Sequence, residues 1–210
     1  MKKMLVVAGL MLAGVCASAQ NYFGVTGGYT LSTHFISEWN LTSSDPIEGG
    51  VSYDYYCKSG FNAGLSFEQR FAPKSNGGNW FLGVSALYSL EGYNIRSEIV
   101  FADGYVKEYD TDCDIKLLKF PVSFGFNFKV NEKVGFAPKV YGIFARNVGA
   151  QVSFEKLSRF SYGGGANINI GERSSIGVGY DWYVSEKNIW NGNAHVNFTY
   201  YIFSTKKNAE

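Results

Sequence analysis

Seven ionisable side chains in this sequence fall on the same side of segments in which polar and apolar residues alternate. They are Glu68, Arg70, Glu91, Lys119, Lys139, Asp181 and His195. Groups that share one side of neighbouring strands point into a common space, and enclosed charges are costly unless they are paired. Two chemistries are open to such a set: an internal network of salt bridges and hydrogen bonds, or a path selective for cations or anions. We expect the network.

The two histidines, His34 and His195, offer little for catalysis or metal binding. A serine–histidine hydrolase is the catalytic alternative. However, His195 falls on the inward side of its segment, and Asn197 rather than a serine stands two positions later. Two histidines alone do not make a typical zinc site, and no Cys/His spacing suggests a metal. We therefore predict no catalytic residue, no metal and no cofactor.

Three cysteines occur, and Cys16 lies in an N-terminal segment treated below. Cys57 and Cys113 lie in segments expected at the same end of the molecule. They could form one disulfide in an oxidising compartment, or remain two separate thiols. Both alternatives stay open, because the sequence does not give the distance between their Cα atoms.

The first 19 residues have the composition of a signal peptide. Lys2 and Lys3 precede an apolar run from Met4 to Val15, and Ala17-Ser18-Ala19 forms a cleavage site. The run is too short for a comfortable membrane-spanning helix, and Val15 is too large to precede a lipid-attachment cysteine. We expect export through the general secretion route and one mature domain, residues 20–210. That domain has 17 basic and 18 acidic residues, so no basic excess points to nucleic acid.

The segment from Gly60 to Gly92 carries the pattern that positions these groups. One side of its strands is bulky and apolar: Phe61, Ala63, Leu65, Phe67, Trp80, Leu82, Val84, Ala86, Tyr88 and Leu90. The other side is mostly glycine, serine and asparagine, with a few charges. Small polar residues fit a crowded interior, and large apolar residues fit hydrocarbon outside. This inside-out alternation is typical of a transmembrane β-barrel.

The same alternation predicts eight strands. They run over about 22–33, 60–71, 79–101, 105–130, 134–146, 159–170, 175–184 and 191–202. Short connections (72–78, 131–133, 171–173) alternate with long ones (34–58, the 92–115 extension, 147–158), as in bacterial outer-membrane barrels. We expect a two-residue turn at Asp103-Gly104 and a bulge at Pro121. The predicted fold is all-β: an eight-stranded antiparallel transmembrane β-barrel with a filled polar interior.

Glycine-rich runs at 27–28 and 163–165 lie inside strand patterns, so they are expected to allow curvature or close packing and not to bind phosphate. The long connections are aromatic and acidic, with Glu38, Trp39, Tyr53, Tyr55, Tyr56, Tyr105 and Tyr109. These residues could anchor protein partners through loops 34–58 and 92–115. Alternatively, they belong to the membrane-interface girdle or pack within the loops. Outer-membrane lipid is the other expected partner.

Several short stretches resemble the PorT-like outer-membrane β-barrel proteins of Bacteroidetes, a Gram-negative group. They are Phe23-Gly24-Val25-Thr26-Gly27-Gly28-Tyr29-Thr30-Leu31-Ser32, Gly60-Phe61-Asn62-Ala63-Gly64-Leu65, Leu87-Tyr88-Ser89-Leu90-Glu91-Gly92, Leu117-Leu118-Lys119-Phe120-Pro121-Val122 and Tyr162-Gly163-Gly164-Gly165-Ala166. Phe120 replaces the isoleucine usual in that family. The resemblance implies an outer-membrane location and eight strands. It brings no catalytic residues, and it links the chain to type IX secretion through the family's named member.

Two functional hypotheses follow. The first is a non-enzymatic outer-membrane barrel with a structural, interaction or secretion-assembly role. The alternative is a small pore or a ligand-binding barrel. A lipid A-modifying hydrolase that uses His195 is a distant third.

Overall fold

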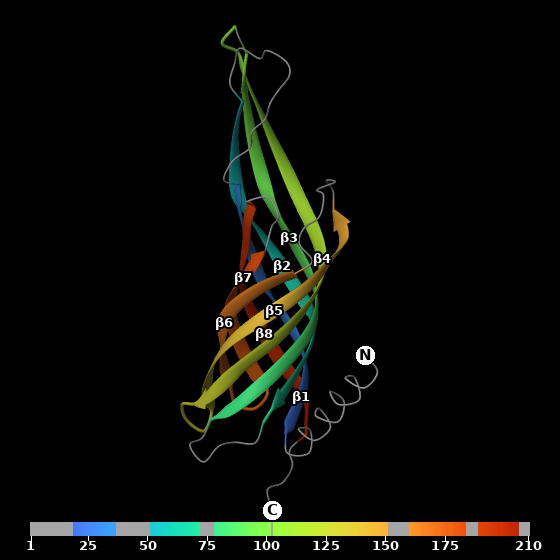
Figure 1. The fold of residues 1–210 in the computed structure, drawn as a ribbon, viewed down its shortest axis with the longest axis vertical. Helices are drawn as coiled ribbons and strands as arrows, with labels where there is room; N and C mark the ends of the chain where they lie inside the picture. Colours follow the sequence, from blue (N-terminus) through green and yellow to red (C-terminus); the bar gives the residue numbers. More distant parts are fainter. Residues whose placement is uncertain are drawn as a thin grey trace, which may run out of the picture.

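The computed structural model describes residues 19–36, 51–71, 78–101, 103–150, 160–183 and 189–205. The predicted signal peptide lies outside this range except for Ala19. Eight strands are present: β1 (Gln20–Ile36), β2 (Val51–Arg70), β3 (Asn79–Val100), β4 (Val106–Lys129), β5 (Val134–Ala150), β6 (Phe160–Ile170), β7 (Ser174–Tyr183) and β8 (Ile189–Thr205). Each pairs antiparallel with the next, and β1 pairs with β8, which closes the barrel (Figure 1). The predicted fold class is confirmed.

The two sides of the barrel wall carry the residue types that the alternation predicts. Apolar side chains cover the outside, including Leu65, which is 49% exposed, and Val122, also 49% exposed. Inward positions are buried and largely polar, and include Thr30, Asn62, Ser89, Ser175 and Asn193. Large apolar groups face outward because the surrounding hydrocarbon, unlike water, accepts them at no cost. In the described part of the chain, no helix is long and apolar enough to cross a membrane.

Strands β1, β2, β5 and β8 run further than the alternation predicts; β8 spans Ile189–Thr205, where 191–202 is expected. The expected loop at 34–58 is wrong at both ends, since β1 continues to Ile36 and β2 already begins at Val51. The register explains the longer β2: Val51 pairs with Ile99, and the ladder continues to Cys57 opposite Tyr93. β5 continues to Ala150, where the sequence predicts an end at Arg146.

The predicted two-residue turn at Asp103-Gly104 is also wrong. Val100 pairs with Val106, and the Phe101 N–H donates to the Tyr105 carbonyl at 2.8 Å. Phe101 and Tyr105 are therefore the last paired residues of the hairpin, and three residues, 102–104, lie between them. The Gly104 N–H donates to the Phe101 carbonyl, and Gly104 has φ of 81°. This left-handed glycine ends a three-residue hairpin loop of the kind that matches the strand twist.

Pro121 does not produce the predicted bulge. The β3–β4 register is the same on both sides of it, with Val84 opposite Val122 and Leu87 opposite Lys119. Because proline has no N–H to donate, the β3–β4 ladder is interrupted between these two pairs, but neither strand contains an extra residue. Register shifts occur elsewhere, at Phe23/Gly24 in β1, at Cys57/Phe61 in β2 and at Lys116/Leu117 in β4.

Parts of β2, β3 and β4 extend well beyond the other strands, at the end of the barrel opposite Gln20 and Thr205 (Figure 1). We call this extension, residues 51–58 and 93–114, the projection. It is a three-stranded antiparallel sheet in which β3 pairs with β2 on one side and with β4 on the other. The long hairpin predicted to extend beyond the membrane corresponds to this element.

Candidate functional site

An ion-pair cluster lies inside the barrel, built from β3, β4 and β7. Lys119 on β4 contacts the Glu91 carboxylate on β3, and its Nζ lies 3.2 Å from Asp181 Oδ2 on β7. All three side chains are at most 5% exposed. Alternation points each of them inward, and barrel closure brings β7 across from β3 and β4. One lysine is thus shared by two buried carboxylates.

Hydrogen bonds hold Glu91 in place from the far wall. Its Oε2 accepts from the Tyr183 hydroxyl at 2.9 Å and from Asn193 Nδ2 at 2.5 Å. Its Oε1 accepts from the Ser89 hydroxyl at 2.7 Å. In a ring of eight strands, β3 and β7 are opposite each other. Side chains from opposite walls therefore meet and fill the lumen at this level.

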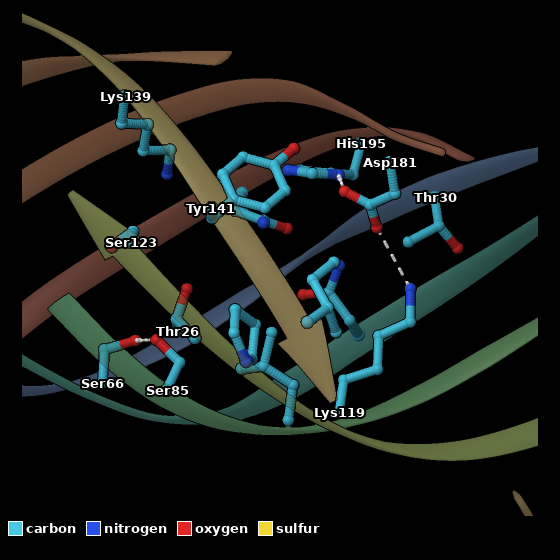
Figure 2. Close-up of a pocket in the computed structure, with 15 residues that line it drawn as sticks. Thr26, Thr30, Ser66, Ser85, Lys119, Ser123, Lys139, Tyr141, Asp181 and His195 are labelled. Atoms are coloured by element: carbon cyan, nitrogen blue, oxygen red, sulfur yellow. Dashed lines mark hydrogen bonds and ion pairs between the residues drawn. The ribbon is translucent and has the colours of Figure 1, made fainter. Parts of the chain in front are cut away.

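His195 lies at the edge of this cluster. Its Nδ1 is 3.4 Å from Asp181 Oδ1, and its ring centroid is 6.0 Å from that of Tyr141 (Figure 2). The Tyr141 hydroxyl itself donates to backbone carbonyls of Gly164 and Tyr180. Among the described residues, no serine or threonine hydroxyl is hydrogen-bonded to His195.

A second cluster occupies the other half of the lumen. Arg70 Nε lies 2.5 Å from Glu68 Oε1, and the Tyr201 hydroxyl donates to Glu68 Oε2 at 3.0 Å. The Arg70 guanidinium lies 4.2 Å from the centroid of the Tyr22 ring. Tyr22 and Tyr201 are buried, each 3% exposed. Sequence analysis missed these two tyrosines, although their inward parity would have indicated them.

A cavity of about 90 Å³ lies beside the first cluster. Lys119, Asp181 and His195 of the first cluster line it, together with Lys139 on β5 and a set of hydroxyl and amide groups: Thr26, Thr30, Asn62, Ser66, Ser85, Ser123 and Asn197. Lys139 forms no salt bridge within the described residues. Its ammonium lies 5.8 Å from the centroid of the Tyr141 ring, and Figure 2 shows Lys139 apart from the Lys119–Asp181–His195 contacts. The structure thus brings six of the seven predicted interior groups into two clusters and leaves Lys139 outside both.

Cys57 is a free, exposed thiol. Cys57 and Cys113 lie opposite the same residue, Tyr93, on the two strands that flank β3. Two strand spacings separate their Cα atoms by about 10 Å, and a disulfide allows no more than about 7 Å. The pairing of these two cysteines stays a prediction, and this spacing favours separate thiols.

The projection carries exposed charges and tyrosines. Arg96 contacts Glu108 and lies 4.0 Å from Asp110, and the hydrogen bond to Glu108 raises the pKa of the Arg96 guanidinium. Lys58 on β2 reaches across β3 to Asp114 at 2.6 Å. Of the aromatic residues predicted for this end, Tyr56, Tyr105 and Tyr109 are exposed. Glu38 and Trp39, and the side chains of Tyr53 and Tyr55, lie outside the described residues.

Solved structures of several outer-membrane barrels are similar to this chain. Ail of Yersinia pestis, solved in complex with the heparin analogue sucrose octasulfate, is 15% identical with a TM-score of 0.43; the match covers 88% of this chain and 99% of Ail. The β domain of the Bordetella autotransporter BrkA is 11% identical with a TM-score of 0.28, covering 85% and 99%. The translocator domain of NalP from Neisseria meningitidis is 10% identical with a TM-score of 0.26, covering 94% and 95%.

No curated protein matches the chain. The family described as outer membrane protein beta-barrel domain matches residues 18–186, which is most of the sequence. With its closed eight-stranded wall, apolar outside and polar inside, the chain belongs to the outer membrane protein beta-barrel domain family.

Proposed function

We propose that this outer-membrane barrel is non-enzymatic and serves as a plugged anchor that presents the projection to a protein partner outside the cell. The observation that carries the proposal is the contact between opposite walls: Glu91 on β3 accepts hydrogen bonds from Tyr183 on β7 and Asn193 on β8. A lumen filled in this way favours anchoring over transport. The three-stranded projection then provides the surface for recognition, on a rigid support.

The resemblance to the PorT-like family supports one class of partner, a component of a secretion apparatus assembled at the outer membrane. The exposed Tyr56, Tyr105 and Tyr109 support a role in protein contact, since tyrosine is frequent among the residues that anchor interfaces. Export through the general secretion route, with cleavage after Ala19, belongs to the same proposal.

The proposal is tested by shortening the projection without disturbing the barrel. Ile95 and Thr111 face each other in the β3–β4 ladder, so residues 96–110 can be replaced by an Asn-Gly turn between them. Both proteins are extracted from cells in mild detergent, and co-purifying proteins are compared by quantitative mass spectrometry. We expect a partner that the shortened variant loses while its barrel still folds, judged by heat-dependent gel migration. An identical set of partners would contradict the proposal.

A small pore or ligand-binding barrel is the second candidate, and the cavity beside Lys139 is the observation that favours it. A cavity of about 90 Å³ holds a few water molecules, since each takes about 30 Å³ in the liquid. Lys119 and Asp181 at its wall pair with each other, so Lys139, which forms no salt bridge within the described residues, would give such a path anion preference. A lipid A hydrolase at His195 has less support, because no hydroxyl of the described residues is hydrogen-bonded to that imidazole.

A further inference from the structure

The β4 side of the projection is a strand edge that no described strand covers. β4 pairs with β3 along the whole of 106–114, whereas its pairing with β5 begins only at Ile115, opposite Ala150. Residues 106–114 therefore present one row of backbone N–H and C=O groups away from β3. Such an edge is a template for pairing with another extended chain.

The connection from β5 to β6 is too short to cover most of this edge. Ala150 lies at the level of Ile115, and Phe160 lies opposite Phe144, six residues lower along β5. Ten residues span at most about 33 Å, and the return alone takes about 20 Å. A chain joining these two points can advance along β4 by only about two residues. The edge from Val106 to about Asp112 lies beyond that reach.

The register identifies which groups point outward from this edge. The Phe101 N–H donates to the Tyr105 carbonyl, so the backbone of Tyr105 faces β3. Alternate residues of an antiparallel strand face the same neighbour, and the β3–β4 register does not shift between this point and Asp114. The N–H and C=O groups that face the open edge are therefore those of Val106, Glu108, Asp110, Asp112 and Asp114.

The edge is acidic as well as open. The projection contains seven acidic and three basic residues, and four of the acids lie on β4. Asp110 and Asp112 have side chains that are 84% and 73% exposed. A second copy of the same edge would bring acid against acid, which disfavours self-pairing. A basic strand placed there would gain opposite charges at alternate positions.

We propose that the β4 edge of the projection, Val106–Asp114, binds an extended, basic segment of a protein partner by strand addition. This inference rests on the proposed function and names the chemistry of the partner. Main-chain hydrogen bonds with Glu108, Asp110 and Asp112 supply the register, and the exposed carboxylates of Asp110 and Asp112 select lysine- or arginine-rich sequences.

The test uses the purified, folded protein in detergent and a nine-residue probe peptide of alternating lysine and valine. Binding is measured by calorimetry, and amide hydrogen exchange is followed by mass spectrometry. We expect binding to slow exchange across 106–114 by about tenfold or more, because each new hydrogen bond must open before its amide exchanges. A peptide with N-methyl groups on its five central amides keeps the charge but should not bind. An alternating glutamate–valine peptide should not bind either.

Two substitutions at one position separate strand addition from charge attraction. Asp110→Pro removes an edge-facing N–H and leaves the β3 ladder intact, because proline is tolerated on an edge. Asp110→Ala removes the carboxylate and keeps the N–H. We expect Asp110→Pro to weaken the probe's affinity by about tenfold or more. Asp110→Ala should weaken it by no more than about fivefold, as for an exposed ion pair.

Strand addition would be overturned if the probe bound Asp110→Pro and Asp110→Ala with equal affinity. It would also be overturned if the N-methylated peptide bound the wild-type protein as tightly as the unmodified probe. Either result would show that the peptide binds by charge attraction alone. A dimer in detergent that Asp110→Pro converts to a monomer would instead identify a second copy as the occupant, which also overturns the proposal. None of these results bears on the shortened-projection experiment. Failure of this inference and failure of the proposed function are therefore distinguishable.

Discussion

The hydroxyl of Tyr183 on β7 lies 2.9 Å from the carboxylate of Glu91 on β3, so a hydrogen bond joins opposite walls of the barrel. The Lys119 ammonium forms an ion pair with the same carboxylate and a second ion pair with Asp181. These contacts make the part of the lumen around Glu91, Lys119 and Asp181 a packed polar core. The same side chains therefore fill the lumen at this level and link three strands of the wall.

The first prediction concerns Lys119. Lys119→Met leaves Glu91 and Asp181 buried without their shared cation, and removing one partner of a buried ion pair costs about 3–5 kcal/mol. We expect a loss of that size in the free energy of unfolding, measured by tryptophan fluorescence during urea titration in lipid vesicles. Lys116→Met, on the exposed outer face of the same strand, is the control and should change stability little.

Adding Glu91→Gln to Lys119→Met removes one of the two unpaired charges and should recover part of the loss. A Lys119→Met protein as stable as the wild type would show that the cluster does not hold the barrel together.

The second prediction concerns glycines on neighbouring strands. A Cβ at Gly165 would lie 2.2 Å from the Val178 carbonyl oxygen and 2.8 Å from the Gly179 Cα, and these backbone atoms belong to the paired strand β7. At Gly142 on β5, a Cβ would meet nothing within 4 Å. We expect Gly165→Ala to destabilise the barrel by about 1–3 kcal/mol, as overpacking does. Gly142→Ala should be nearly neutral in the same titration, and equal effects would argue against close packing at Gly165.

Alternation with a period of two was enough to predict which side chains point inward, because it depends on each strand alone. Which inward groups meet depends on register, and single residues shift it. The shifts at Cys57/Phe61 and Lys116/Leu117 leave no clear local signal, whereas Pro121, where the sequence suggests a bulge, leaves the register unchanged. The hydrogen bond from Tyr201 on β8 to Glu68 on β2, and the separation of Lys139 from both clusters, depend on closure of the whole ring. The sequence alone could not indicate them.

The third prediction concerns orientation. Cys57 is exposed at the base of the projection, so a membrane-impermeant maleimide should label it in intact cells. A Cys113→Ser background makes the label specific. The control is Lys133→Cys, in the turn at the opposite end, with both native cysteines replaced by serine; it should be labelled only after the outer membrane is permeabilised. The reverse pattern would place the projection in the periplasm.

The most direct test of the account is the conductance of the purified protein in a planar lipid bilayer. The polar contacts that join β3, β4 and β7 predict a wild-type barrel that inserts without steady openings. A Glu91→Ala/Lys119→Ala/Asp181→Ala variant, folded by the gel-migration criterion, should leak ions and show that the assay detects an opened lumen. Steady nanosiemens-scale openings of the wild-type protein would contradict the plugged anchor and favour the pore.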